Sequence, residues 1–353
     1  MLVRMQFAAA TAGFFVLFSG AAQAQRNSAP PPPEPARAFY ACAYQLDDHD
    51  KTCIPIELKG VIKNPDLALA PASLNKMLTA DLTYEHMLAH GKQLDDPFTM
   101  VTRDDAEKGR YGERNGEVAG GGWTLRYNPK HSRLSDLPED HVFTYREVIL
   151  AMTVYSANDF AVAAARAIAP NGNLPAFAAM MNAEGAKMGM KNTVFKTPEG
   201  MPATGQKTTA EDMATLVRAL VAKYGTDKFD ELFGQETALI AGREIPGHLR
   251  LLQNPAIIGG KTGSSAEGAN VAGYAQRGKI GIAFSTLGSP TYDKGRTRDA
   301  FTMKAVEGIF VLLGVGDAQA KTPDATKAKT RAKPLKRPQS PVRKTAARNP
   351  RHR

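Results

Sequence analysis

The order of its segments constrains the fold of this chain most strongly, because strand-like segments lie at both ends of a helical middle. Residues 38–46 and 53–59 resemble two strands of a hairpin around a turn-like acidic run, and further strand-like segments follow the helical region. Between them, apolar residues recur at helical spacing. The pattern predicts an α+β fold, with a mostly antiparallel sheet built from both ends of the domain and an inserted all-helical lobe. The later strands are expected at 257–263, 270–276 and 279–287, and the helices at 75–90, 148–152, 160–168, 177–188, 213–224 and 297–313.

The N-terminus has the features of a secretory signal peptide. Arg4 precedes the apolar run 7–18, and the run leads into Ala22-Gln23-Ala24. A positive start, a short apolar core and an A-x-A end are typical of such a signal, so we expect export to the periplasm. The alternative is an uncleaved anchor.

Composition separates the remaining flanks from the globular part. The first flank is Pro-rich and is expected to be extended. The C-terminal flank is rich in Lys, Arg, Pro and Ala, with few large apolar residues, and is expected to be disordered. The predicted organisation is a signal peptide at 1–24, a linker at 25–37, a globular domain at 38–315 and a basic tail at 316–353.

The net charge of +10 comes from that tail. Residues 321–353 contain twelve Lys or Arg and one acid, Asp324, so they carry +11. Arg4 adds one charge, which leaves residues 25–320 near −2. The body therefore lacks the electrostatic footprint of a nucleic-acid-binding protein, and no nucleic-acid partner is expected. The tail either holds the protein near anionic envelope polymers or only improves its solubility.

Cys42 and Cys53 are the only cysteines. Their positions suit the two strands of the predicted hairpin, and an exported protein folds where a disulfide can form. Two free thiols remain the alternative, because the spacing alone does not decide between them.

A possible nucleophile lies at the start of the first predicted helix, in Ser73-Leu74-Asn75-Lys76. Residues three apart share one helical face, so the Lys76 amine can reach the Ser73 hydroxyl. A serine hydroxyl becomes a strong nucleophile when a neighbouring base removes its proton, and a lysine can serve if burial lowers its pKa. S-x-x-K alone is weak evidence, since a capping serine and a surface lysine give the same pattern.

Two later motifs make the site more specific. Ser156-Ala157-Asn158 falls between two helices of the middle region, and Lys261-Thr262-Gly263 falls on a predicted strand. The order S-x-x-K, S-x-N, K-T-G is the motif set of penicillin-recognising serine enzymes. Each motif also has an ordinary structural interpretation, so the ordered set carries the inference.

Over residues 39–314 the chain resembles the serine D-alanyl-D-alanine carboxypeptidases, the low-molecular-mass penicillin-binding proteins of the β-lactamase/transpeptidase-like superfamily. Beyond the three motifs, the resemblance rests on the segments around Asn182, 188–193 and 292–296. Asn75 stands where the family usually has Thr. The resemblance implies that Ser73 attacks the carbonyl between the two D-alanines of a peptidoglycan pentapeptide.

The resemblance also implies the other roles. Lys76 is the general base, Ser156 relays a proton toward the leaving amine, and Asn158 holds Lys76 and the substrate amide. Backbone N–H groups of Ser73 and Ser264 form the oxyanion hole. The substrate-binding residues that it implies are Lys261, Thr262, Gly263, Ser264 and Arg296, of which Thr262 and Arg296 bind the terminal carboxylate. β-Lactams are expected to acylate the same serine, and the mechanism requires no cofactor or metal.

Three alternatives share these motifs. A class A β-lactamase needs a glutamate in an E-x-x-L-N loop, and Glu199 is the nearest candidate without the rest of that pattern. A DD-endopeptidase uses the same chemistry on cross-links. A non-catalytic wall-binding protein requires the motifs to be relics.

Overall fold

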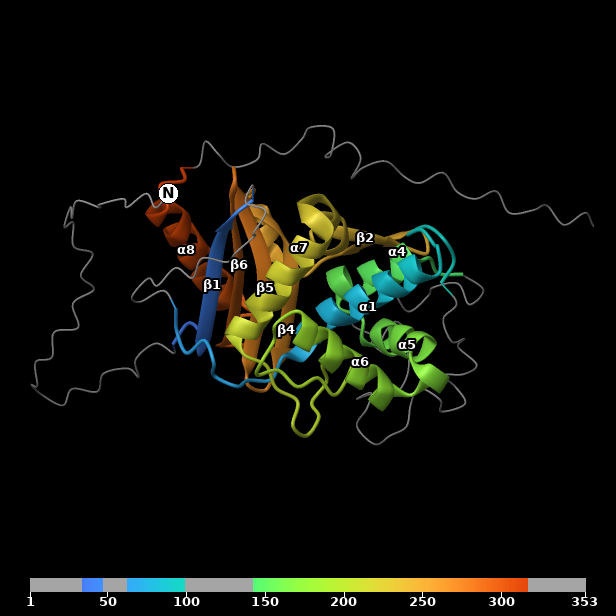
Figure 1. Ribbon diagram of the computed structural model, residues 1–353. Coiled ribbons are helices and arrows are strands. Elements are labelled where there is room, and N and C mark those ends of the chain that lie inside the picture. Colours follow the sequence, from blue (N-terminus) through green and yellow to red (C-terminus); the bar gives the residue numbers. More distant parts are fainter. Residues whose placement is uncertain (1–33, 47–61, 99–141, 317–353) are drawn as a thin grey trace, which may run out of the picture. The chain divides into compact units, whose positions relative to one another are not determined.

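A four-stranded antiparallel sheet, in the order β1-β6-β5-β4, is the frame of the molecule. The computed structural model describes residues 34–46, 62–98 and 142–316 (Figure 1). The N-terminal strand β1 pairs with β6 from the C-terminal part of the chain, in a register that joins Ala38 to Leu287. The sheet is thus built from both ends of the domain, as the order of segments predicted. The bounds are Ala38–Gln45 for β1, Ile257–Ser265 for β4, Gly268–Arg277 for β5 and Ile280–Ser289 for β6.

Alternate side chains of the sheet enter two separate cores, because successive residues of a strand point to opposite faces. Phe39 and Ala41 of β1 pack in the smaller core with Phe310 of α8 (Arg296–Leu312). Ala38 and Tyr44 pack in the larger core, which extends into the helical lobe. Helix α7 (Ala210–Phe233) contacts the face of the sheet that borders the larger core, and Figure 1 shows α7 and α8 on opposite sides of the sheet.

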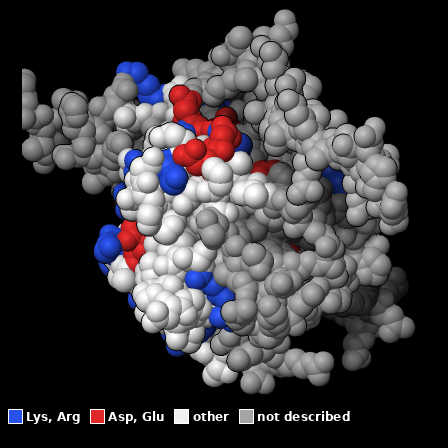
Figure 2. Space-filling model, turned by 90° about the vertical axis from the view of Figure 1, so that its right-hand side faces the viewer, with Lys and Arg blue, Asp and Glu red and all other residues white. Residues whose placement is uncertain are grey.

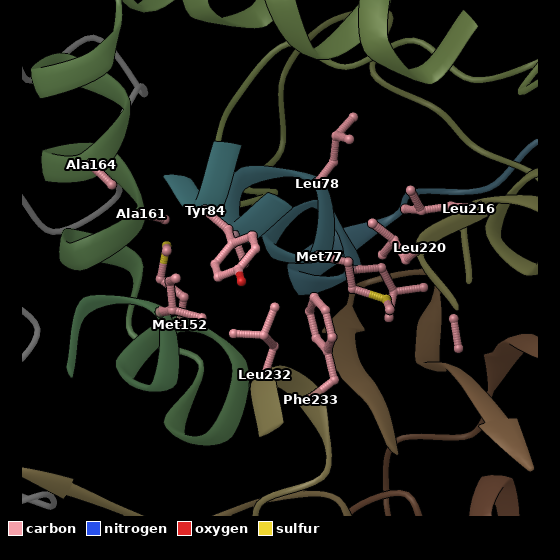
Figure 3. Close-up of a cluster of buried hydrophobic side chains, with 14 of the residues drawn as sticks. Met77, Leu78, Tyr84, Met152, Ala161, Ala164, Leu216, Leu220, Leu232 and Phe233 are labelled. Atoms are coloured by element: carbon pink, nitrogen blue, oxygen red, sulfur yellow. The ribbon is translucent and has the colours of Figure 1, made fainter. Parts of the chain in front are cut away.

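The helical lobe lies between β1 and β4 in the chain. Figure 3 shows Met77 and Tyr84 of α1 among Met152, Ala161 and Leu232, which come from other elements of the lobe and from α7. Burial of these side chains is the main source of stability for such a lobe. Its elements are η1 (Ala72–Leu74), α1 (Asn75–Ala89), α4 (Tyr145–Leu150), the π turn η3 (Ala151–Tyr155), α5 (Asn158–Ile168), η4 (Pro170–Gly172) and α6 (Leu174–Lys187).

Side chains cap the starts of α4 and α7. The Thr144 hydroxyl accepts from the Glu147 N–H at 3.2 Å, and the Glu147 carboxylate accepts from the Thr144 N–H at 2.9 Å. This reciprocal pair is a capping box. The Thr209 hydroxyl accepts from the Asp212 N–H at 3.1 Å at the start of α7.

The structure differs from the predicted elements in two places. Gly225, at a φ of 76° and a ψ of 164°, kinks α7 where the predicted helix 213–224 ends, and a second helical segment that the sequence did not predict follows to Phe233. A hairpin not predicted from the sequence follows, with β2 (Thr237–Ile240) and β3 (Arg243–Pro246) joined by a two-residue turn at positive φ. Its alternating buried and exposed residues are a period-2 signal, but each strand has only four residues. A short 3₁₀ turn, η5 (Arg250–Gln253), then leads to β4.

Several predicted segments lie outside the described residues: the signal peptide, the strand at 53–59, most of the linker and the tail beyond 316. The last linker residues, 34–37, pack against the domain, since Ala36 is buried and the Arg37 N–H donates to the Leu287 carbonyl at 3.1 Å. Cys42 is disulfide-bonded, and the sequence offers Cys53 as its one possible partner. Among the described residues, no helix is long and apolar enough to cross a membrane.

Candidate active site

Ser73 lies in the short 3₁₀ turn η1, directly before α1, and its side chain is half-buried. The turn begins at Ala72, whose φ of 51° is uncommon for a residue with a side chain. Two glycines allow other segments to approach it. A Cβ atom at Gly200 would lie 1.8 Å from the Ala72 carbonyl oxygen, and one at Gly263 would lie 3.2 Å from the Ser73 nitrogen. The serine is therefore held between β4 and the segment around Gly200.

Lys76 reaches Ser73 as the spacing predicted. Its Nζ donates to Ser73 Oγ at 2.8 Å and to the backbone carbonyl of Glu199 at 2.8 Å, and the side chain is fully buried. Burial lowers the pKa of Lys76 to about 7, against the negative charges of Glu199 and Asp159, which raise it. A neutral amine in contact with the serine hydroxyl can accept its proton.

Lys261 lies on β4, beside this pair. The side chain is buried, and its Nζ donates to the Thr262 carbonyl at 2.8 Å. Burial lowers the pKa of Lys261 well below its ordinary value, and the positive charges of Lys76 and Arg298 lower it further. Gly263 of the same motif packs against the backbone of Ser73, so the first and third motifs share one site. Ser264 is exposed on the same strand, so the two predicted oxyanion donors lie on η1 and β4, which contact each other.

The second motif turns the chain between η3 and α5. Ser156 ends the π turn at a φ of 69° and is half-buried, and Asn158 is the first residue of α5. The Asn158 amide donates to the Met201 sulfur at 3.7 Å. The two hydrogen bonds of Lys76 go to Ser73 and Glu199, so the predicted contact of Asn158 with Lys76 is not made here.

Two hydrogen bonds explain why Asn75 is accommodated within the nucleophile motif. Its amide Nδ2 donates to the Thr197 carbonyl at 2.8 Å and to Gln206 Oε1 at 2.9 Å. The Gln206 amide in turn donates to the Met201 carbonyl at 2.7 Å. These bonds fix residues 197–201 against the start of α1.

Glu199 also belongs to this site, although the sequence suggested it only as the nearest candidate for the glutamate of a β-lactamase. Its side chain is 1% exposed. Its carboxylate oxygens make no hydrogen bond of normal geometry among the described residues, although the backbone N–H groups of Glu199 and Met201 and the Thr197 hydroxyl lie near enough to lower its pKa. Burial raises the pKa of Glu199 to about 7, although the Lys76 charge opposes the change. The sequence did not indicate that Glu199 is buried, because it is a charged residue between Pro198 and Gly200.

The two arginines at the start of α8 have different surroundings. Arg296 is exposed and lines a pocket of about 820 Å³ together with Arg250 and Met303. Arg298 is buried, and its Nη1 donates to the Asn270 carbonyl at 3.0 Å, on the strand that pairs with β4. Arg298 also lowers the pKa of Lys261. The structure therefore brings Arg298 toward the motif residues, while the role of Arg296 in carboxylate binding stays a prediction.

Acidic and basic side chains are mixed on the described surface of the helical lobe. Figure 2 shows its Lys and Arg residues in separate small groups with Asp and Glu between them, rather than in one continuous patch. The charged groups of chemical interest are those buried around Ser73.

Comparisons with known proteins agree with this arrangement. Residues 61–291 match the family model Peptidase S11, described as D-alanyl-D-alanine carboxypeptidase. The chain is 28% identical over 290 residues to the D-alanyl-D-alanine carboxypeptidase DacC of Escherichia coli, covering 80% of this chain and 64% of the relative. It is 30% identical over 233 residues to DacD of Salmonella typhimurium, covering 65% and 54%. The chain thus spans less than two thirds of the length of these relatives.

The solved structures that it resembles share the fold. Penicillin-binding protein 5 from Haemophilus influenzae superposes with a TM-score of 0.60 at 22% identity, covering 80% of this chain and 73% of the other. Penicillin-binding protein D2 from Listeria monocytogenes, in an ampicillin-bound form, gives 0.57 at 22% identity, covering 79% and 98%. The α+β fold predicted from the sequence, of the β-lactamase/transpeptidase type, is confirmed.

Proposed function

Because this chain belongs to the Peptidase S11 family of D-alanyl-D-alanine carboxypeptidases, we propose that it removes the terminal D-alanine from peptidoglycan stem peptides through an acyl-enzyme on Ser73. The 2.8 Å contact between Lys76 Nζ and Ser73 Oγ carries the proposal. A buried lysine whose pKa lies near 7 is a base matched to neutral pH, and it already touches the hydroxyl that it would activate.

The reaction begins with the Ser73 hydroxyl. Lys76 takes its proton while Oγ attacks the carbonyl carbon between the two D-alanines. The resulting oxyanion accepts hydrogen bonds from the backbone N–H groups of Ser73 and Ser264. The C–N bond then breaks, and the proton passes from Lys76 through Ser156 to the amine of the leaving D-alanine. Water hydrolyses the Ser73 ester and releases the shortened peptide.

Substrate binding is assigned to β4 and its neighbours. Lys261 lies beside Lys76 with a lowered pKa, and an anionic substrate bound next to it would favour its charged form. Thr262, Gly263 and an arginine of α8 receive the terminal carboxylate, since a guanidinium forms charge-assisted hydrogen bonds with that group. The predicted arginine is Arg296, while Arg298 is the buried alternative. Asn158 binds the substrate amide.

β-Lactams are proposed as covalent inhibitors of the same serine. The similar Listeria protein is described in an ampicillin-bound form. Attack of Ser73 on the lactam carbonyl opens the ring, and the leaving nitrogen stays tethered within the adduct. A slowly hydrolysed adduct is expected for a carboxypeptidase, whereas rapid turnover would indicate a β-lactamase.

Export to the periplasm is proposed from the signal-like residues 1–24, since peptidoglycan lies outside the cytoplasm. The basic tail is proposed to hold the enzyme near anionic envelope polymers. Truncation after residue 316 tests this second proposal. Wall binding that is weakened by salt in the full chain, and reduced in the truncated chain, is expected. Unchanged binding would assign the tail to solubility alone.

The central experiment is intact-mass measurement after exposure to benzylpenicillin, followed by peptide mapping. One adduct per chain, located on Ser73 and absent in Ser73→Ala, is expected. Release of D-alanine from a pentapeptide is then measured beside digestion of cross-linked muropeptides, which distinguishes a carboxypeptidase from an endopeptidase. An adduct on another residue, or D-alanine release by Ser73→Ala, would refute the assignment.

A further inference from the structure

The carboxylate of Glu199 is a group of the site that the proposed mechanism leaves unused. It is buried, and its oxygens make no hydrogen bond of normal geometry among the described residues, although the N–H groups of Glu199 and Met201 and the Thr197 hydroxyl lie near enough to lower its pKa. Burying a carboxylate without such bonds is costly, so a residue of this kind requires an explanation. An exposed position for the same side chain would avoid this cost.

The backbone holds Glu199 in place from both sides. Its carbonyl accepts the hydrogen bond of Lys76 Nζ at 2.8 Å. The next residue, Gly200, lies against the Ala72 carbonyl so closely that no side chain fits there. The preceding residue, Pro198, accepts from the Thr79 hydroxyl at 2.7 Å. The carboxylate therefore has little freedom to leave the interior.

Charged groups from four elements act on Lys76 or on its neighbour Lys261. Lys76 of α1 and Lys261 of β4 are both buried, and the positive charge of Lys76 lowers the pKa of Lys261. Arg298 of α8 adds to the positive charge near Lys261. Asp159 of α5 is a second acid acting on Lys76, and its Oδ1 accepts from the Phe160 N–H at 3.1 Å.

We propose that Glu199 is a positioning residue that acts through Lys76: as its buried counter-charge, it sets the pH range in which Lys76 is a free base for Ser73. The inference rests on the proposed function, because it concerns the step in which Ser73 is acylated. It assigns the unpaired carboxylate an electrostatic role.

The sign of the effect follows from the charges. A negative Glu199 favours the ammonium form of Lys76 and raises the pKa of Lys76, while burial lowers it. Glutamine at position 199 keeps the shape and removes the charge, so Lys76 would lose its proton at a lower pH. A base of lower pKa is also a weaker base, so the maximal acylation rate is expected to fall a few-fold.

The test is the pH profile of the acylation rate of the full chain with a fluorescent penicillin. For Glu199→Gln, the acidic limb is expected to move to lower pH by about one unit, the shift typical of removing a nearby opposite charge. Glu199→Asp keeps the charge and should retain the limb near its original position. Glu244→Gln, which changes an exposed glutamate of β3 in the same way, should leave the profile unchanged.

The outcomes separate this inference from the proposed function. If the wild-type chain forms no adduct on Ser73, both are refuted. If the adduct forms and the acidic limb of Glu199→Gln coincides with that of the wild type, the inference alone is refuted. A thermal melt of each variant shows that folded protein is compared, and each rate is expressed relative to its own maximum.

Discussion

Helix α1 carries two buried charged residues, Lys76 and Asp81, and their surroundings differ. Lys76 donates its two hydrogen bonds to uncharged oxygens, those of Ser73 and of the Glu199 backbone. Asp81 is equally buried, but one of its oxygens accepts from Lys223 Nζ at 2.9 Å and also from the Tyr224 hydroxyl. Among the described residues, Lys76 thus makes no hydrogen bond to a charged group, whereas Asp81 forms an ion pair with Lys223 of α7.

This difference indicates that Lys76 is placed to react, whereas Asp81 is placed to attach α1 to α7. The Asp81 cluster ties α1 to α7 through an ion pair and a phenol whose oxygen also lies 3.0 Å from Glu85 Oε1. Lys76 has no such ionic contact among its described hydrogen bonds, and burial moves its pKa to about 7. Perturbed groups of this kind are concentrated at functional sites. We therefore expect substitutions at the two positions to have opposite consequences.

The largest effect is expected for Lys76→Met. Methionine fills a similar volume and removes the base, so the rate of Ser73 acylation should fall about 10³-fold, within the range for loss of a general base. The melting temperature should stay the same or rise, because an apolar residue replaces a desolvated charge. Stopped-flow acylation and thermal melts measure the two quantities. A variant that is strongly destabilised would assign Lys76 a structural role.

Asp81→Ala should show the reverse pattern. It leaves Lys223 and Tyr224 without their buried partner, and breaking such a pair costs about 3 kcal/mol. Chemical denaturation measures this loss of unfolding free energy. The acylation rate of the folded fraction is expected to remain within about threefold of the wild type, well inside the tenfold that 1.4 kcal/mol would produce. A loss of acylation comparable to that of Lys76→Met would show that Asp81 also supports the reaction and is not only structural.

The sequence predicted one of these two positions because its signal is local. Ser73 and Lys76 are three residues apart on a helix, a spacing that can be read directly. Asp81 and Lys223 lie in helices separated by most of the domain, and their pairing depends on how α1 packs on α7. For the same reason the buried Glu199 and the inward arginine Arg298 had no sequence signal.

The elements of the fold were likewise predictable where the sequence pattern is local. Strands β4, β5 and β6 were predicted from continuous apolar and glycine-containing runs. The segment of α7 beyond Gly225 was not predicted: Gly225 breaks the helix as a glycine often does, and the segment after it is held by packing of Phe229 and Phe233 in the core. Local patterns therefore located the elements, while burial set their limits.

The pH dependence of stability provides a third test, now of Glu199 itself. Its folded pKa is raised from 4.5 to about 7. The folded state thus binds a proton more tightly than the unfolded state, and this contribution to stability is lost as the pH rises through that window. The Glu199→Gln variant has no titratable carboxyl at this position. Its stability relative to the wild type should therefore rise between pH 5 and pH 8, by roughly 2 kcal/mol.

Urea denaturation of both proteins at the two pH values measures this difference. Lys76, whose folded pKa of about 7 lies below the ordinary value of 10.5, makes both proteins more stable as the pH rises above 7. Loss of the Glu199 charge lowers this pKa further, so Lys76 changes the difference in the same direction. A constant difference between the variant and the wild type from pH 5 to pH 8 would show that the Glu199 carboxyl does not titrate in this range.

The smallest expected effect concerns the cap of α7, the helix that carries Lys223 and Tyr224. The Thr209 hydroxyl accepts from the Asp212 N–H at 3.1 Å, and loss of such a cap costs about 1 kcal/mol. Thr209→Ala should therefore lower the unfolding free energy slightly, while Thr209→Ser, which keeps the hydroxyl, should restore most of it. Acylation of Ser73 should be unchanged in both, because α7 attaches the lobe and supplies no group to the reaction. A change in acylation rate that follows the loss of the cap would show that α7 also controls the position of Lys76.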